Sequence, residues 1–460
     1  MKTLRGFPYF VLAAFLTFAA GACGTPADSA TAGLSTAVAG LPSAAPEEVG
    51  MSSERLSRLS GAMQQLVDEG RLAGITTMVA RHGRVVHFET FGHRDIAADA
   101  PMTPDAIFRI YSMSKPITGV ALMMLYEEGK FRLSDPVEMY IPEFEGLEVA
   151  VGEGQEGPLV EEADHPMTVR ELMSHTAGFG YGPYVSDSQV EDMYAERDVF
   201  AWDGTLRDMI ERLADIPLRQ QPGSMWYYSI SVDVQGYLVE VLSGQPFDQF
   251  LEDRLFGPLG MVDTGFYVPP EKAGRFAELY GYDSDGRLLP PTATEFEEYT
   301  RLGSSVVTAE TVTARYLEPP TLLSGGMGMV STTRDYMRFS QMLLNGGELD
   351  GIRILAPLTV DLMRRNQLPP EVAEMGPGPG PGLGFGLDFA VVTDPVEADG
   401  VSEGEYYWGG AAGTWFWIDP VEDLVFVGMI QQFGVDRPDV RSLSHRLTYQ
   451  AIMEPGRSAH

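Results

Sequence analysis

The chain has 460 residues, of which 44% are hydrophobic and 21% charged, so it is long enough to bury a large core in one or two domains. Its 65 acidic residues outnumber the 32 Lys and Arg residues, and the formal net charge is -33. A surface this acidic repels nucleic acid and anionic membrane, which excludes a nucleic-acid-binding role.

The N-terminus is predicted to be an export signal. Lys2 and Arg5 precede an apolar stretch at 7–20 that is too short for a comfortable membrane span, so the signal is predicted at residues 1–22. Residues 23–47, rich in Ala, Ser, Thr and Pro, are predicted to form a flexible tether.

The only cysteine of the chain, Cys23, directly follows small residues at the end of the predicted signal. This arrangement resembles the cleavage box of bacterial lipoproteins, in which the cysteine is lipidated; ordinary signal cleavage nearby is the alternative. The resemblance implies a protein that is periplasmic or attached to a membrane through Cys23. A single cysteine also leaves no disulfide.

The folded part is predicted to begin with a helix and a β-hairpin. Apolar residues recur at helical spacing from an N-cap at Ser52 or Ser53 to Gly70. Two strand-like runs follow at 74–80 and 84–91, joined by a turn.

The middle of the chain, from about 131 to 375, shows mainly short helical patterns and loops, with an acidic loop at 146–165. A Gly-Pro run at 376–382 is predicted to be a mobile surface segment. Beyond it the patterns predict three strands and a last helix, at 385–392, 414–418, 424–431 and 440–453.

Both ends of the chain are therefore predicted to combine strands with a helix, and a mainly helical insert separates them. This layout predicts an α/β fold of the α+β type: an antiparallel sheet flanked by helices, with an all-α subdomain at its side. The domain is predicted at 48–455, with its sheet part at about 48–110 and 383–455 and its helical part at about 111–382. A cleft at their boundary is the expected active site.

The first candidate chemistry is Ser112 with Lys115, in a stretch that reads as a buried helix opening on the serine. Lys115 then lies one turn on, on the same face. A helix N-terminus and burial both disfavour the lysine cation, so a neutral amine could accept the serine proton. These residues alone do not distinguish that reading from a Ser112 that caps the helix and a Lys115 that reaches solvent.

The second candidate is Tyr228, which lies after a Pro-Gly turn and just before a predicted helix. A tyrosine next to a lysine can share a proton with it and act as a base and then as an acid. The alternative is a core tyrosine with a satisfied hydroxyl.

The third candidate is the run Trp408, Gly409, Gly410 and Ala411, which precedes a predicted strand. Glycines at a sheet edge let a substrate approach the backbone closely. A free N–H there, together with that of Ser112, would form an oxyanion hole. The alternative is a Gly-rich hairpin turn.

In this order around a helical insert, the three features resemble the serine β-lactamase-like superfamily, most closely its class C-like esterase branch. That branch also contains D-Ala-D-Ala carboxypeptidases and D-aminopeptidases. Three more segments are similar to family segments: VRELMSHTAGF at 169–179, FGPLGMVDTGF at 256–266 and SGGMGMVSTTRDYMRFSQMLLNGG at 324–347.

The resemblance implies that Ser112 is the acylated nucleophile and that Lys115 and Tyr228 are the general base system. It further implies that the amides of Ser112 and Ala411 form the oxyanion hole. Trp408, Gly409 and Gly410 would then take the place of the Lys-Thr-Gly strand of β-lactamases.

Two positions depart from the family pattern. Ile230 stands where the family's Tyr-x-Asn motif has its Asn, and Ser231 or Asp233 is a candidate replacement. Trp408 replaces a lysine that helps to hold a substrate carboxylate, which favours neutral esters. Trp202, Trp226, Trp408 and Trp415 are candidates to line an acyl or alcohol pocket, or are plain core.

The resulting expectation is a secreted serine hydrolase without a cofactor, cleaving short acyl esters. Its partner would be a small-molecule ester or amide. The seven histidines show no metal-ligand spacing. Two alternatives are a carboxypeptidase, aminopeptidase or β-lactamase of the same fold, and a catalytically weak binding member of the family.

Overall fold

The computed structural model describes residues 40–182, 188–282, 288–289, 314–369, 372, 380–433 and 437–456. The predicted signal, Cys23, residues 23–39 of the predicted tether and most of the Gly-Pro run lie outside these residues. The described residues all belong to one compact unit, Val38–His460. Within them, no helix has both the length and the apolar character needed to cross a membrane.

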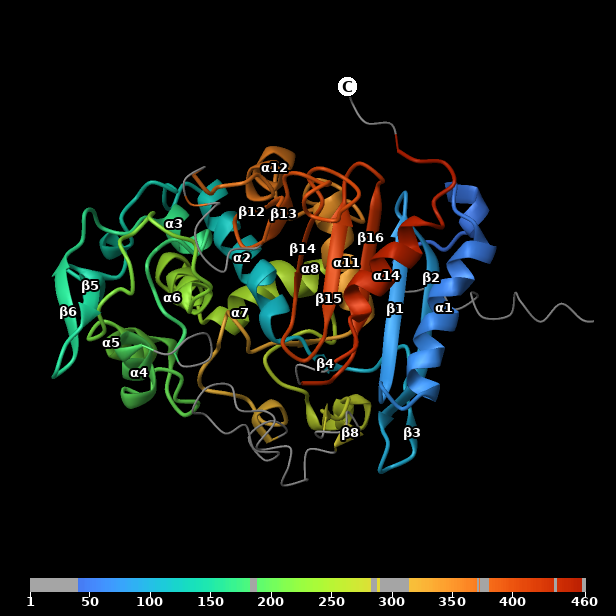
Figure 1. Cartoon of the computed structure of the whole chain (residues 1–460), viewed down its shortest axis with the longest axis horizontal. Coiled ribbons are helices and arrows are strands. Elements are labelled where there is room, and N and C mark those ends of the chain that lie inside the picture. The colour runs from blue at the N-terminus through green and yellow to red at the C-terminus, as the bar shows by residue number, and fades with distance from the viewer. Residues whose placement is uncertain are drawn as a thin grey trace, which may run out of the picture. The chain divides into compact units, whose positions relative to one another are not determined.

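The predicted antiparallel sheet is confirmed. Eight strands lie in the order β12-β13-β14-β15-β16-β1-β2-β3, so the C-terminal strands join the N-terminal hairpin through the β16–β1 pair (Figure 1). Their bounds are β1 Gly74–Arg81, β2 Arg84–Asp95, β3 Ala100–Pro101, β12 Leu383–Phe385, β13 Ala390–Val392, β14 Tyr406–Gly409, β15 Trp415–Asp419 and β16 Leu424–Met429.

Four two-stranded pairs complete the β-structure of the described residues. They are β4 Phe108–Arg109 with β9 Val330–Ser331, β5 Glu148–Glu153 with β6 Pro158–Glu162, β7 Gly281–Tyr282 with β8 Leu288–Leu289, and β10 Glu348–Leu349 with β11 Ile352–Arg353.

The α-helices of the described residues have the following bounds: α1 Ser53–Asp68, α2 Ser114–Glu127, α3 Val169–Met173, α4 Gln189–Glu196, α5 Leu206–Leu213, α6 Ser231–Ser243, α7 Phe247–Leu251, α8 Gly257–Leu259, α11 Thr333–Leu344, α12 Pro357–Met363 and α14 Val440–Tyr449. Ser52 caps α1, as predicted, by accepting a hydrogen bond from Arg55 N.

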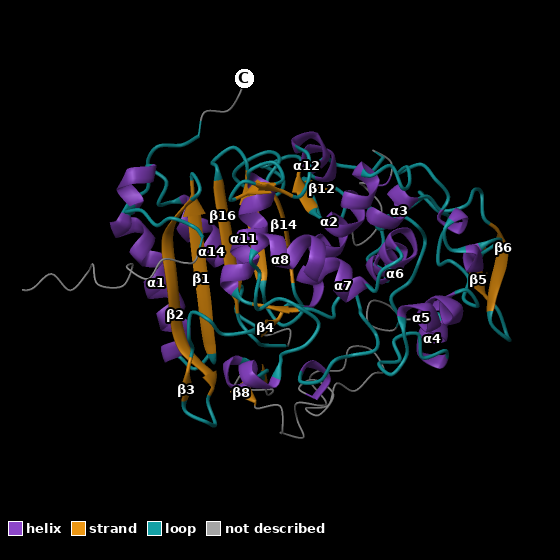
Figure 2. Ribbon diagram, turned by 180° about the vertical axis from the view of Figure 1, so that it is seen from behind, coloured by secondary structure: helices purple, strands orange, loops and turns teal. Residues whose placement is uncertain are grey.

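The central strands are apolar on both faces because helices cover both faces. On β1, Met78 and Ala80 belong to one core cluster, while Ile75 and Val79 belong to the other. This alternation follows the two-residue period of a strand. Helices α1 and α14 cover one face, and α11 packs against β16, β1 and β15 on the other (Figure 2).

The helical region packs beside the sheet, and its central contact joins α2 to α6. Both helices are almost wholly buried, and the first turn of each carries residues of the candidate site. Helix α11 lies within the stretch that we predicted as helical subdomain, yet it packs on the sheet. The chain therefore returns to the sheet earlier than predicted.

Four local predictions differ from the structure. The helix near Ser112 begins at Ser114, and Ser112 lies in a preceding 3-10 turn rather than at an N-cap. The predicted acidic loop contains the β5–β6 hairpin. The strand predicted at 385–392 is the β12–β13 hairpin, because Asp388 adopts a left-handed φ of 66°. At the end of the predicted tether, Leu41 is buried.

Candidate active site

Ser112 is presented by a strained 3-10 turn, Tyr111–Met113, directly before α2. The residue before it, Tyr111, has a φ of 44°, which is rare for a bulky side chain and costs about 1–3 kcal/mol. Ring contacts hold Tyr111 in place, at centroid distances of 6.3 Å to Tyr316 and 5.3 Å to Phe433. The turn leaves Ser112 partly exposed, whereas Met113 is buried.

The structure brings the three predicted catalytic side chains together. The hydroxyl oxygen of Tyr228 lies 2.7 Å from Ser112 Oγ, and Lys115 Nζ lies 3.3 Å from the same oxygen. Tyr228 reaches the site from the loop before α6, 116 residues along the chain from Ser112. A serine hydroxyl therefore has two groups within reach that are able to exchange its proton.

The ammonium group of Lys115 is buried but well supplied with partners. The residue is 1% exposed, and Nζ donates to the Gly326 carbonyl at 2.8 Å and to the Tyr181 hydroxyl at 3.4 Å. Nζ also lies 4.6 Å from the centre of the Tyr228 ring, within cation–π range. These contacts offset part of the desolvation cost of a buried cation.

Tyr181 and Gly326 were missed by the sequence analysis. Tyr181 follows the predicted family turn that ends at Phe179, and Gly326 lies in the Gly-rich run that begins at Ser324. Both segments were recognised as family-like, yet no local pattern shows that they meet Lys115.

Ile230 stands where the family motif has an Asn, and neither predicted replacement, Ser231 or Asp233, forms a hydrogen bond with Lys115. Ser231 Oγ lies 2.8 Å from Ser229 Oγ. Asp233 accepts hydrogen bonds from Gly326 N, at 3.1 Å, and from the Ser324 hydroxyl. Asp233 therefore holds the loop whose carbonyl Lys115 contacts, and its carboxyl also interacts electrostatically with the Lys115 cation. Burial raises the pKa of the Asp233 carboxyl, and the Lys115 cation opposes that rise.

Aromatic rings enclose the Tyr228 side chain. His175, Tyr181 and Trp408 lie 5.0, 5.4 and 5.6 Å from it between ring centres, and Trp226 stacks on it at 6.3 Å. His175 Nδ1 accepts a hydrogen bond from Ser229 N, so the ring is tied to the backbone next to Tyr228. Burial lowers the pKa of His175 well below its usual value, with a smaller contribution from Lys115, and keeps the imidazole neutral.

The turn between β14 and β15 is pinned against the segment that precedes Ser112. A side chain at Gly410 would place its Cβ 2.3 Å from Ile110 O, so only glycine permits this approach. Thr414 Oγ1 donates to the same carbonyl at 3.3 Å, and Gly410 N donates to Thr414 O at 2.7 Å. Ala411, at the tip, donates its N–H to no described residue, as an oxyanion-hole amide requires.

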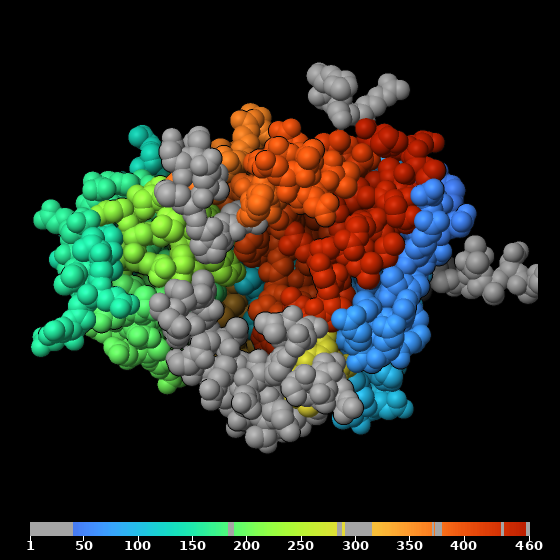
Figure 3. Space-filling view, viewed as in Figure 1, coloured from blue at the N-terminus to red at the C-terminus, as the bar shows by residue number. Residues whose placement is uncertain are grey.

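Ser112, Tyr228 and the 408–411 run line one cavity of about 570 Å³, which we call the Ser112 cavity. Trp408 and Trp415 line it, whereas Trp226 packs behind Tyr228 and Trp202 packs under Arg315. The face of the molecule in Figure 3 is hollowed between the helical part, in green, and the C-terminal strands, in red.

The Ser112 cavity also contains residues that the sequence analysis did not single out. Arg437, Asp439 and Arg441, in the segment that leads into α14, line it together with the nucleophile. Their signal in the sequence is weak, because charged residues before a helix are common at protein surfaces.

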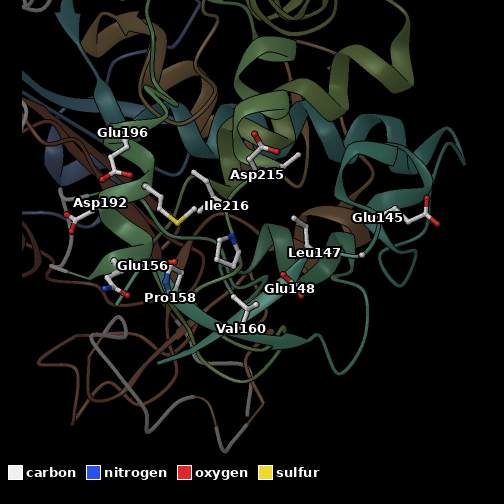
Figure 4. A pocket seen from close by; sticks show the side chains of 16 residues that line it. Glu145, Leu147, Glu148, Glu156, Pro158, Val160, Asp192, Glu196, Asp215 and Ile216 are labelled. Atoms are coloured by element: carbon white, nitrogen blue, oxygen red, sulfur yellow. The ribbon is translucent and has the colours of Figure 1, made fainter. Parts of the chain in front are cut away.

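A second and larger cavity, of about 810 Å³, lies between the β5–β6 hairpin and α4 (Figure 4). We call it the acidic cavity, because six carboxylates and no Lys, Arg or His line it: Glu145, Glu148, Glu156, Asp192, Glu196 and Asp215. It contains no serine, cysteine or tyrosine. Over the described residues, no three His, Cys, Asp or Glu side chains are grouped as metal ligands.

Comparison with known proteins agrees over most of the chain. The profile of the family described as Beta-lactamase matches residues 59–449. A Mycobacterium tuberculosis protein whose name states no activity is 36% identical over 382 residues, which is 80% of this chain and 88% of that protein. The esterase EstB of Burkholderia gladioli is 34% identical over 365 residues, covering 78% of this chain and 86% of the esterase.

A solved structure of a hydrolase shares the fold of this chain. EstCE1, described as a hydrolase with promiscuous acyltransferase activity, superposes with a TM-score of 0.71 at 28% identity. The match covers 87% of this chain and 99% of EstCE1.

Proposed function

Because this chain belongs to the beta-lactamase family and is a serine hydrolase of that fold, we propose that it is an esterase that cleaves short acyl esters through Ser112. The observation that carries the proposal is the convergence of the Tyr228 hydroxyl and Lys115 Nζ on Ser112 Oγ, at 2.7 and 3.3 Å. The similarity to an esterase at 34% identity supports the substrate class.

In the proposed acylation step, Tyr228 enters as the phenolate, and Ser112 Oγ attacks the ester carbonyl carbon as its proton passes to the phenolate oxygen. Lys115, 4.6 Å from the centre of the Tyr228 ring, stabilises negative charge on the phenol oxygen. The tetrahedral intermediate collapses when the bond to the alcohol oxygen breaks, and the departing oxygen takes the proton from Tyr228. The products are the free alcohol and an acyl ester on Ser112.

Deacylation repeats the sequence with water as the nucleophile. Tyr228 accepts a proton from the water, the resulting hydroxide attacks the acyl carbon, and Ser112 Oγ leaves with the proton that Tyr228 returns. We propose that the amides of Ser112 and Ala411 stabilise the oxyanion in both steps. The close approach of Gly410 to the Ile110 carbonyl supports this assignment, because it holds the turn beside the nucleophile.

The test is a substrate panel on purified protein that lacks residues 1–22: p-nitrophenyl butyrate, nitrocefin and a D-Ala-D-Ala peptide. Ser112→Ala should abolish butyrate hydrolysis and labelling by a fluorophosphonate probe, whereas Ser57→Ala, an exposed serine on α1, should preserve both. Labelling that persists in Ser112→Ala would refute the nucleophile. Turnover of nitrocefin or the peptide in preference to the ester would refute the esterase assignment.

We also propose that the protein is exported and lipidated at Cys23, on the strength of the basic start, the apolar stretch and the small residues before that cysteine. In a bacterial host fed an alkyne fatty acid, the wild-type chain should incorporate the label and fractionate with membranes. Cys23→Ala should do neither. A label-free wild-type chain would contradict the lipidation.

A further inference from the structure

Arg437 places a cation in the Ser112 cavity from an element that sequence reasoning did not connect to the site. The residue precedes α14 and lines the cavity together with Ser112, Trp408 and Ala411. It is half-buried, and its Nη1 donates to the carbonyl oxygens of Ala411, at 2.8 Å, and Gln432, at 3.1 Å. The guanidinium is therefore anchored on the same residue whose amide is assigned to the oxyanion hole.

The rest of this guanidinium has no partner among the described residues. An arginine has five N–H donors, and the bonds of Arg437 use only Nη1. Among the described residues the Nε–Nη2 edge has no hydrogen-bond partner, and that edge matches the two oxygens of a carboxylate. No carboxylate lies within ion-pair distance of Arg437 in the part of the chain that the structure describes.

The charge of Arg437 is poorly compensated. Burial lowers the pKa of the Arg437 guanidinium, and the charges of Tyr282 and Asp439 oppose that effect without cancelling it. A second cation, Arg441, lines the same cavity and lies 3.7 Å from the centre of the Tyr407 ring. The cavity therefore carries two arginines against one rim carboxylate, Asp439, in a chain whose net charge is -33.

We propose that the preferred substrates are esters that carry a carboxylate a few bonds from the scissile carbonyl, and that the free edge of Arg437 binds this carboxylate. The inference rests on the proposed esterase function and deepens it. It also reverses the neutral-ester expectation drawn from Trp408, because the cation missing from the strand is supplied from the segment before α14. Ser112 chemistry is unchanged, since the carboxylate takes no part in bond making or breaking.

The experiment compares two substrates with the same leaving group, p-nitrophenyl butyrate and mono-p-nitrophenyl glutarate, at pH 7.5 and low salt. The quantity measured is the ratio of kcat/KM for the anionic ester to that for the neutral ester. We expect the wild-type ratio to exceed 1 and Arg437→Gln to lower it about tenfold or more, mainly through KM for the glutarate. Arg437→Lys should restore part of the ratio.

The neutral ester distinguishes a lost contact from a damaged site. If Arg437→Gln only loosened the turn at Ala411, both esters would lose activity together and the ratio would stay constant, which would overturn the proposal. Arg446→Gln is the matched control, because it removes an exposed arginine from α14 that does not line the cavity. Glutarate dianion should also inhibit butyrate hydrolysis in the wild type and lose potency in Arg437→Gln.

The two proposals fail in different ways. Butyrate turnover with a ratio below 1, or a ratio that Arg437→Gln leaves unchanged, overturns the carboxylate preference and leaves the esterase function standing. Absence of turnover with both esters overturns the esterase function itself.

Discussion

Two of the cavities of this domain, the acidic cavity and the Ser112 cavity, differ in the chemistry of their lining residues, and the larger one has the less reactive lining. The acidic cavity, at about 810 Å³, is the larger, but its lining has no nucleophile and no cation. The Ser112 cavity, at about 570 Å³, combines a serine, a tyrosine, three glycines at the β14–β15 turn and two arginines. The comparison teaches that the volume of a cavity alone does not identify the candidate active site; the convergence of proton donors and acceptors on one nucleophile does.

The charge distribution sharpens the contrast. Six carboxylates surround one cavity, whereas the other holds Arg437 and Arg441 against Asp439. The chain has about twice as many acidic as basic residues, so a cavity with more cations than anions is a local exception. Such a cavity can accommodate an anionic group. An anionic ester would be repelled by the acidic cavity and attracted by the Ser112 cavity.

One helix links the two regions. α4 directs Asp192 and Glu196 into the acidic cavity, while Glu191 points inward. Glu191 accepts hydrogen bonds from Tyr181 N, at 3.0 Å, and Gly182 N, at 2.6 Å, and so holds the loop that brings Tyr181 to Lys115. Neighbouring carboxylates on α4 therefore have opposite roles, one structural and two facing solvent.

The largest effect is expected from removing the two proposed proton-transfer groups beside Ser112. Lys115→Met and Tyr228→Phe should each lower kcat for p-nitrophenyl butyrate by about 10²-fold or more, the usual scale of acid–base catalysis. The matched controls Lys130→Met and Tyr126→Phe change the same residue types near the other end of α2, which lies outside the cavity, and should retain turnover. Near-normal kcat in either of the first two variants would remove that residue from the mechanism.

The next effect concerns Glu191. Its side chain is fully buried, and it also accepts from the Tyr227 hydroxyl at 2.9 Å and lies 3.7 Å from Arg219. Glu191→Ala strips acceptors from several buried donors, so the free energy of unfolding should fall by about 3 kcal/mol. Urea unfolding measures this loss. Asp192→Asn, the next residue on α4 but facing the acidic cavity, should change stability by less than about 0.5 kcal/mol. Equal losses in the two variants would contradict the division of roles on α4.

How far the sequence predicted these features depended on the range of each interaction. Ser112, Lys115 and the 408–411 run carry local motifs, and the strand-like runs at 74–80, 84–91 and 424–431 predict the sheet. Tyr181, Gly326 and Arg437 have no such signal, because each enters the site only through tertiary packing of distant segments. The break of the predicted strand at 385–392 was missed because the left-handed Asp388 is set by its buried surroundings, where its amide donates to Met173 O.

The carboxylates of the acidic cavity face solvent, whereas the imidazole of His87 is buried in the sheet, so its protonation is coupled to folding. Burial lowers the pKa of His87, on β2, to about 4, whereas the unfolded chain titrates near its ordinary value of 6.5. Between these values the unfolded state binds the proton and the folded state does not. Stability is therefore present above pH 6.5 and falls as the pH drops towards 4, by roughly 2 kcal/mol at pH 4.5. Urea midpoints from pH 7 to 4.5 measure this, and His87→Gln should flatten the slope; an unchanged slope would contradict the assignment.

The smallest effect should come from the acidic cavity itself. Asp192 and Glu196 are spaced i,i+4 on α4, so their charges repel, and Glu196 additionally lies at the C-terminal end, where the helix dipole disfavours an anion. Glu196→Gln should therefore raise the free energy of unfolding by a few tenths of a kcal/mol at low salt. Asp192→Asn relieves the same repulsion but removes a favourable first-turn anion, so its gain should be smaller. Both gains should vanish at about 0.5 M NaCl, because exposed charges are screened within a few ångströms there. If the gain in stability persists in salt, or is larger for Asp192→Asn than for Glu196→Gln, repulsion between the cavity carboxylates does not destabilise α4.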